Sequence, residues 1–317
     1  MIEPPAAIAV DGLTKQFGRM TAVDRLHFTV ATGEIFCLVG PDGAGKTTTM
    51  RIVAGFLPAT EGRVVVCGFD IEEQATEAKR RIGYLPEGAP SYPEMTPRSF
   101  LAFVAEARGI APEKRRARLD EVFHLLHLEH VLDQTIETLS KGYRRRVGLA
   151  QALVHDPEVL ILDEPTDGLD PNQKHEVREL IGRMAKSKII VISTHLLEEV
   201  EAVCNRAIII AHGKILADDT PHGLEARSRF HNAVTMKLAN PDLLPSVRAA
   251  VAKLPEVEST ELDQNSGRLT AFPARGKLPL AAINGLAETQ RWELAELHLE
   301  SGRLDEVFRS ITGGAAA

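Results

Sequence analysis

One segment near the N-terminus constrains this chain more than any other. Residues 40–47 read Gly-Pro-Asp-Gly-Ala-Gly-Lys-Thr and match the pattern G-x-x-x-x-G-K-[ST]. An apolar run at 33–39, typical of a strand, precedes the segment, and a helical pattern at 46–54 follows it and ends at Gly55. Such loops bind phosphate, because glycines let backbone N–H groups face phosphate oxygens and the helix N-terminus adds positive partial charge. A glycine-rich turn with a solvated lysine is the alternative, and the strand–loop–helix context argues against it.

Two polar residues of this loop have expected roles in holding a phosphate chain and its metal ion. Lys46 should reach the β- and γ-phosphates, and the Thr47 hydroxyl should ligate Mg²⁺. The remaining candidate nucleotide contacts in the loop are Gly40, Asp42, Gly43, Ala44, Gly45 and Thr48.

A second candidate element is an apolar strand that ends in two carboxylates. The run 159–162 is continuously apolar, and Asp163, Glu164 and Pro165 follow it. Asp163 is predicted to hold Mg²⁺, usually through water, and Glu164 to polarise an attacking water. By itself, Asp-Glu-Pro at a strand end is often only a turn. Its occurrence together with the phosphate loop favours the catalytic interpretation.

The order of apolar and helical patterns predicts an α/β core with a parallel sheet. Further short apolar runs lie at 63–67, 188–192 and 207–211, and they alternate with helical patterns. Between about 91 and 155 the strand signals stop, and Thr96-Pro97 is a favourable helix start. We therefore expect a helical subdomain inserted in the core.

The chain beyond about residue 220 has a different pattern, and we expect a core domain at 1–220 and an accessory domain at 221–317. Strand and helix patterns follow the order strand, helix, strand, strand, helix, strand, at 233–238, 243–254, 257–262, 268–272, 278–287 and 292–299. This order is that of a small α+β, ferredoxin-like domain. A last helix is expected at 303–311.

Charge and hydropathy exclude some classes of protein. The chain has 37 Lys and Arg against 44 Asp and Glu, a formal net charge of −7, so bulk charge would not hold it to nucleic acid. No window approaches the roughly 18 uninterrupted apolar residues of a membrane helix. Three cysteines, Cys37, Cys67 and Cys204, lie far apart without a CxxC spacing, so we expect neither a disulfide framework nor a zinc site.

Several further segments, in order along residues 8–215, resemble motifs of the ATP-binding cassette (ABC) ATPases. Leu139-Ser140-Lys141-Gly142-Tyr143 is similar to the LSGGQ signature of that family. The segment 168–171, Gly-Leu-Asp-Pro, resembles the D-loop and contains Asp170, and His195 resembles the switch histidine. Phe17 lies where the family places an aromatic residue that stacks on adenine.

The resemblance implies a phosphate-loop ATPase fold and a mechanism. Two copies would pair head to tail, with ATP between the phosphate loop of one copy and Ser140 and Gly142 of the other. His195 would hydrogen-bond the γ-phosphate, and Asp170 would link the two sites. ATP and Mg²⁺ are the implied ligands, and no nucleic acid is expected. A separate integral membrane permease would be the second partner, which places the chain at the cytoplasmic face of the inner membrane.

Four positions depart from the family pattern. Lys141 and Tyr143 replace Gly and Gln of the signature, and Asp42 replaces the more usual Asn of the phosphate loop. Glu87 stands where the family has the glutamine of the Q-loop, and we expect it on the metal side of the nucleotide. Leu-Pro-Glu in this loop resembles a subset of bacterial exporters with separate permeases, which includes drug, gliding-motility and copper-enzyme maturation systems.

Two other functions are weighed against transport. Translation ATPases of this family have two cassettes in one chain, and repair ATPases insert a long coiled coil between loop and signature. This chain has one phosphate loop, and Lys46 and Ser140 are too close in sequence for such an insertion. The second alternative to transport is a nucleotide-sensing module without catalysis, and the presence of both Glu164 and His195 argues against it.

Overall fold

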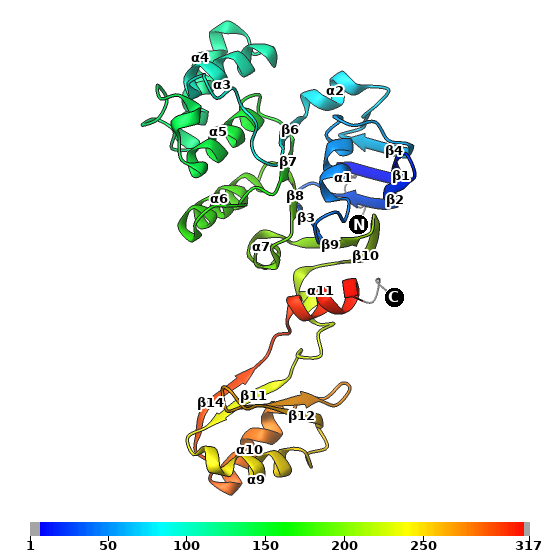
Figure 1. Cartoon of the computed structure of the whole chain (residues 1–317), viewed down its shortest axis with the longest axis vertical. Coiled ribbons are helices and arrows are strands. Elements are labelled where there is room, and N and C mark those ends of the chain that lie inside the picture. Colours follow the sequence, from blue (N-terminus) through cyan, green and yellow to red (C-terminus); the bar gives the residue numbers. More distant parts are fainter. Residues whose placement is uncertain (1–6, 314–317) are drawn as a thin grey trace. The chain divides into compact units, whose positions relative to one another are not determined.

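The computed structural model describes residues 7–313, which form two compact units. One unit ends at Thr220 and the other begins at Pro221 (Figure 1). All candidate site residues named above belong to the first unit. Among the residues described, no helix has both the length and the apolar composition that crossing a membrane requires.

A six-stranded sheet forms the centre of the first unit. Five neighbouring strands are parallel, and β10 pairs antiparallel with β9 at one edge. Across the sheet the strands are β10 (Lys214–Asp219), β9 (Arg206–Ala211), β3 (Ile35–Val39), β8 (Ile189–Thr194), β7 (Val159–Asp163) and β6 (Ile82–Leu85). Every residue of β3 and β7 is buried, as in strands that are covered on both faces. The predicted α/β core with a parallel sheet is confirmed.

The strand order brings three loops together at the carboxyl ends of β3, β8 and β7. Because β8 lies between the other two strands, the segments that follow all three meet at one edge of the sheet. The register places Val39 opposite Thr194 and Asp163 opposite Ser193. Ligand sites in open parallel sheets form at this edge. The fold therefore brings the phosphate loop next to the acidic strand end.

A four-stranded antiparallel sheet packs beside the central one (Figure 1). Its order is β2 (Met20–Val30), β1 (Ile8–Phe17), β4 (Glu61–Val66) and β5 (Phe69–Asp70). Helix α1 (Lys46–Val53) contacts strands of both sheets, and one hydrophobic cluster includes residues of both. Sequence patterns predicted the strand at 63–67 but not the β1–β2 hairpin. The register of that hairpin shifts at three points, which breaks the alternation that a sequence reading needs.

Helices fill the stretch in which the strand signals stop. The helices of the first unit after α1 are α2 (Ala75–Arg80), α3 (Pro97–Ala107), α4 (Pro112–Leu125), the 3₁₀ turn η1 (Ile136–Thr138), α5 (Lys141–Leu153), α6 (Pro171–Met184) and α7 (Leu197–Val203). Thr96 begins α3 as predicted, because its hydroxyl accepts a hydrogen bond from the Ser99 N–H at 3.2 Å. Helix α5 packs against α3, α4 and β6, so the signature segment at its start belongs to the helical subdomain.

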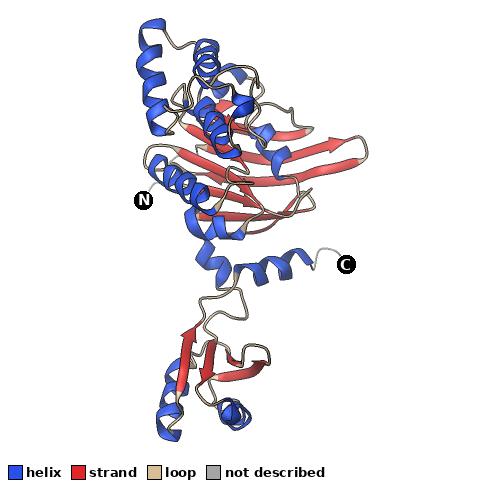
Figure 2. Ribbon diagram, turned by 60° about the vertical axis from the view of Figure 1, so that its left-hand side comes forward, coloured by secondary structure: helices blue, strands red, loops and turns tan. Residues whose placement is uncertain are grey.

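Figure 2 shows the strands and helices of the second unit, which follow the predicted ferredoxin-like order along the chain. Its sheet runs β12 (Val257–Asp263), β13 (Arg268–Pro273), β11 (Val234–Leu238) and β14 (Leu294–Leu299). The helices are α8 (Pro221–Glu225), the 3₁₀ turn η2 (Pro241–Leu243), α9 (Leu244–Val251), α10 (Leu280–Gln290) and α11 (Leu304–Gly313). Val247 and Val251 of α9 and Ile283 of α10 pack on one face of this sheet and form the core of the unit.

The expectation about the cysteines is wrong for one pair. Cys37 and Cys204 form a disulfide, with Cα atoms 6.1 Å apart, although 167 residues separate them in sequence. Cys37 lies in β3, and Cys204 directly follows α7 and leads into β9, the neighbour of β3. Sequence spacing carries no information about this proximity, which the strand order creates. Cys67 is free, and the described part of the chain holds no cluster of three or more metal-binding side chains.

His155 makes the stability of the first unit sensitive to acid. Its Nε2–H donates to the Ile82 carbonyl at 3.0 Å, while Nδ1 is buried without a partner among the described residues. Burial, and then the nearby Arg108 guanidinium, lower the pKa of His155 from 6.5 to about 4. The unfolded chain therefore takes up this proton at a higher pH than the folded one. Neutral His155 makes its full contribution to the free energy of unfolding above pH 6.5. This contribution is lost as the pH falls toward 4, by up to about 3 kcal/mol.

Replacing His155 by glutamine, which does not titrate, should remove this pH dependence. We expect the free energy of unfolding of the wild type to exceed that of His155→Gln at pH 7, and the gap to narrow steadily toward pH 5. Denaturant unfolding of both proteins across this range measures the gap, and the other titrating groups cancel in the comparison. Parallel curves would show that His155 does not control the acid response.

Candidate active site

The loop between β3 and α1 has the backbone that a phosphate cradle requires. Gly43 and Gly45 have positive φ values of 77° and 105°. A Cβ on Gly45 would lie 2.5 Å from the Ala22 carbonyl oxygen, and one on Gly40 would lie 2.3 Å from that of Ile210. Only glycine fits these two positions. The loop can thus turn its N–H groups toward a bound anion at the start of α1.

Lys46, the first residue of α1, is held at the mouth of this loop. Its side chain is only 6% exposed, and Nζ donates to the carbonyl oxygens of Gly40 at 2.7 Å and Pro41 at 3.1 Å. Nζ also lies 3.7 Å from Glu164 Oε1. A buried ammonium with these partners is well placed to bind phosphate oxygens.

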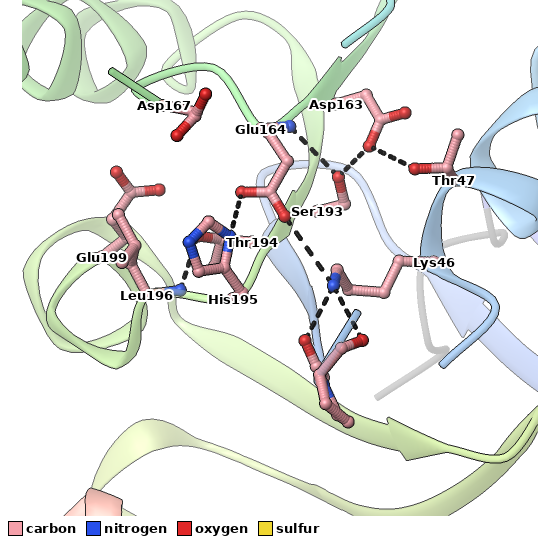
Figure 3. A network of polar contacts seen from close by, with 12 residues as sticks. Lys46, Thr47, Asp163, Glu164, Asp167, Ser193, Thr194, His195, Leu196 and Glu199 are labelled. Carbon is pink, nitrogen blue, oxygen red and sulfur yellow. Dashed lines mark hydrogen bonds and ion pairs between the residues drawn. The ribbon is translucent and has the colours of Figure 1, made fainter. Parts of the chain in front are cut away.

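Asp163 ends β7 as a fully buried carboxylate (Figure 3). Its Oδ1 accepts hydrogen bonds from Ser193 Oγ of β8 and from Thr47 Oγ1 at 3.3 Å. Its Oδ2 is buried and has no hydrogen-bond partner among the residues that the structure describes. An unsatisfied carboxylate oxygen beside a hydroxyl is a donor set that suits a hard divalent cation. The residues therefore fit the Mg²⁺ expected from the sequence.

Glu164 follows with its carboxylate between a lysine and a histidine (Figure 3). Its Oε2 lies 2.9 Å from His195 Nδ1, and its N–H group donates to the Ser193 backbone oxygen at 3.1 Å. Glu164 has a left-handed backbone with φ of 49°. For a residue with a Cβ this conformation costs about 1–2 kcal/mol, so the surrounding contacts must hold it in place.

These groups surround one cavity of about 860 Å³. The predicted site residues that line it are Phe17, Asp42, Gly43, Ala44, Gly45, Lys46, Thr47, Thr48, Glu87, Glu164 and His195. Gly40 and Asp163 do not line the cavity but bond directly to residues that do. Phe17, at the end of β1, is 45% exposed at its rim. The volume is that of a small-molecule site.

Sequence reasoning missed part of the cavity wall. The additional lining residues are Met20, Thr21, Ala22, Asp167, His212 and Gly213. Met20 is 61% exposed at the β1–β2 hairpin, and His212 and Gly213 form the turn between β9 and β10. Asp167 lies in the loop between β7 and α6, three residues after Glu164. No local motif marks the other residues, because they reach the site only through the packing of two hairpins.

Besides Gly40 and Asp163, three more predicted residues, Ser140, Gly142 and Asp170, do not line this cavity. Ser140 and Asp170 are the N-caps of α5 and α6, where they accept backbone hydrogen bonds from Tyr143 and from Asn172 and Gln173. Gly142 packs so closely against Gln173 that a Cβ would lie 2.6 Å from that side chain. The starts of α5 and α6 therefore contact each other, and these three residues lie outside the cavity that the phosphate loop lines.

Comparisons with known proteins identify the relatives of this chain. Residues 23–167 match a family model described as ABC transporter. The chain is 36% identical over 317 residues to the Nod factor export ATP-binding protein I of Paraburkholderia xenovorans, covering 98% of each chain. It is 29% identical to the linearmycin resistance ATP-binding protein LnrL of Bacillus subtilis, covering 96% of this chain and 98% of the relative.

Solved structures have the same fold. The dimeric structure of MJ0796, a bacterial ABC transporter cassette, matches with a TM-score of 0.63 and 23% identity. The match covers 68% of this chain and 98% of that cassette.

Proposed function

This chain belongs to the ABC transporter family of ATPases, and we propose that it uses ATP hydrolysis to drive export through a separate membrane permease. It is an ATP-binding subunit of the exporter type. The observation that carries the proposal is the meeting of Lys46, Asp163 and Glu164 with His195 at the ends of three adjacent strands. If the site held nucleotide-binding residues but no carboxylate next to the phosphate loop, it would support a nucleotide sensor rather than an enzyme.

Within the cavity, the phosphate loop and Lys46 would bind the phosphate chain of ATP, and Phe17 would stack on the adenine at the rim. Asp163 and Thr47 would hold Mg²⁺, with Glu87 on the same side. When bound, Mg²⁺ neutralises charge on the phosphate oxygens. The proposal is supported by Asp163 Oδ2, which is buried and has no hydrogen-bond partner among the described residues.

Glu164 would orient a water molecule and accept its proton during hydrolysis. His195 would hold the Glu164 carboxylate in the free protein and hydrogen-bond the γ-phosphate in the complex. This assignment is supported by the 2.9 Å contact between the two side chains and by the cavity that both of them line, in which the γ-phosphate would bind.

The complete site would include a second copy of this chain. Ser140 and Gly142 lie outside the cavity of their own chain, at the start of α5, where backbone N–H groups and the helix dipole attract anions. We assign them to the γ-phosphate of ATP that is bound by the partner copy, and we assign Asp170 to contacts between the two sites. The relative solved as a dimeric cassette supports this arrangement.

The permease would dock on the helical subdomain and the Glu87 loop and hold the chain at the cytoplasmic face of the inner membrane. Tyr92 and Phe103 support this docking face, because they are 50% and 51% exposed and pack edge to face. The names of the two relatives refer to different cargoes, so we assign cargo selection to the permease.

Co-expression tests the transport proposal. Alone, the chain should be found in the soluble fraction, and together with its permease it should move to the membrane fraction and gain ATPase activity. Tyr92→Ala combined with Phe103→Ala should weaken both effects and leave basal hydrolysis within about twofold. If the permease changes neither the membrane fraction of the chain nor its ATPase activity, the exporter function is contradicted.

Glu87 should act beside the metal rather than as the catalytic base. Its carboxylate is exposed on the cavity wall, and Mg²⁺ accepts carboxylate oxygen readily. Glu87→Gln should therefore retain ATPase activity within about tenfold, a barrier change of about 1.4 kcal/mol or less. Glu87→Ala should reduce stimulation by the permease more than the basal rate. If Glu87→Gln loses as much turnover as Glu164→Gln, the roles of the two glutamates are misassigned.

We also propose that residues 221–317 are an accessory domain with a regulatory or dimer-supporting role. The unit has its own hydrophobic core between its sheet and the helices α9 and α10. The candidate site residues all lie in the other unit.

A further inference from the structure

Arg145 is a buried cation whose side chain contacts the backbone of Glu164, the candidate catalytic residue. It lies in the second turn of α5 and is 4% exposed. Its Nη2 donates to the Glu164 carbonyl oxygen, and its Nε donates to that of Pro165 at 3.0 Å. Among the described residues, no carboxylate lies within ion-pair distance of its guanidinium. The two main-chain carbonyls are its hydrogen-bond partners.

Burying this guanidinium without a carboxylate partner costs free energy. Its presence therefore points to a role that an apolar side chain could not fill. Burial lowers the pKa of Arg145, and only the more distant charges of Asp167, Asp163, Glu164 and Glu87 oppose that effect. A buried cation without a carboxylate partner opposes folding. Its neighbours on α5 differ, because Arg144 is exposed and Arg146 pairs with Glu176.

Arg145 and Ser193 hold the Glu164 backbone from opposite sides. Ser193 of β8 accepts the Glu164 N–H through both its backbone oxygen and its hydroxyl, while Arg145 of α5 donates to the Glu164 carbonyl. The residue between these contacts has the left-handed φ of 49° and precedes a proline, a position where helical conformations are disfavoured. The direction of the Glu164 side chain, toward Lys46 and His195, depends on this backbone conformation.

We propose that Arg145 is a positioning residue that couples the placement of α5 to the catalytic carboxylate. This inference rests on the proposed function, in which Ser140 and Gly142 at the start of α5 meet the nucleotide of the second copy. Arg145 lies about one helical turn beyond these residues. When the partner's nucleotide seats α5, Arg145 fixes the Glu164 peptide and so readies hydrolysis of the nucleotide in its own chain. Nucleotide binding at one site of the dimer is thereby coupled to hydrolysis at the other site.

Arg145→Met should separate catalysis from binding. We expect kcat to fall about 100-fold, a loss that misplacing a reacting group by about 1 Å can cause, while KM for ATP stays within about threefold. Arg145→Lys keeps a charge and one donor to a carbonyl, so it should recover part of the lost kcat. Arg144→Gln, on the exposed side of the same turn, is the matched control and should keep kcat within about twofold.

The double variant Arg145→Met with Glu164→Gln distinguishes positioning from general support of the fold. If Arg145 acts through Glu164, the double variant should turn over no more than about twofold slower than Glu164→Gln alone. Thermal unfolding and the stoichiometry of ATP binding report how much protein is folded, and kcat is expressed per binding site. Should Arg145→Met not fold, Arg145→Lys and Arg145→Gln provide the same comparison.

The outcomes separate this inference from the proposed function. Wild-type kcat per site in folded Arg145→Met, or a full additional loss in the double variant, would overturn the role of Arg145 while leaving the ATPase intact. A wild-type protein that binds ATP without hydrolysing it, even with its permease, would overturn the proposed function itself.

Discussion

Glu164→Gln is expected to bind ATP with wild-type affinity and to lower turnover by a factor of about 100 or more. The amide keeps the size of the side chain and can still contact His195, but it cannot accept a proton from water. The variant should therefore accumulate as an ATP-bound dimer, since hydrolysis is the step that releases it. Single-turnover hydrolysis and size-exclusion chromatography with ATP measure the two effects.

A matched control lies at the other end of the same strand. Glu158 directly precedes β7, and its side chain is 55% exposed and pairs with Arg81. Glu158→Gln makes the same chemical change away from the cavity and should leave turnover within about twofold, because exposed ion pairs contribute little. Wild-type hydrolysis by Glu164→Gln would show that another group activates the water.

The phosphate loop could be predicted because its requirements are local. Gly43 and Gly45 have positive φ, and α1 begins at Lys46, as the strand–loop–helix pattern indicates. The acidic pair was predictable for a similar reason. A continuous apolar run fixes the end of β7 at Asp163, and parallel strands bring their carboxyl ends to one edge.

The conformation of Glu164 could not be predicted from its sequence neighbours. Its left-handed backbone is held by Ser193 and Arg145, which lie 29 and 19 residues away along the chain. The sequence predicted the helical subdomain that contains Arg145 but not the direction of this side chain. Residues from the hairpins, such as Met20 and His212, and the pairing of Cys37 with Cys204 depend in the same way on tertiary packing.

Lys46→Ala is expected to weaken binding of Mg²⁺-ATP by about 100-fold or more, a loss of about 2.7 kcal/mol. The wild-type ammonium is preorganised, because two carbonyls of the phosphate loop hold it in a position that is 6% exposed. Charge-assisted hydrogen bonds to phosphate are strong in such a site. The alanine variant also leaves the Glu164 carboxylate without its cation, which adds repulsion toward an incoming phosphate chain.

Lys188 provides the control for losing a lysine that is held in a similar way. Its Nζ donates to the Pro157 carbonyl at 2.7 Å and to Asp156, its side chain is 13% exposed, and it lies at the amino end of β8, the opposite end from the cavity. Lys188→Ala should lower the thermal stability and leave ATP affinity unchanged, whereas Lys46→Ala should lose affinity while remaining folded. Titration calorimetry with ATP, together with thermal unfolding of both variants, measures this contrast. Equal affinities in the two variants would mean that the loop backbone and the helix N-terminus, rather than the Lys46 charge, account for phosphate binding.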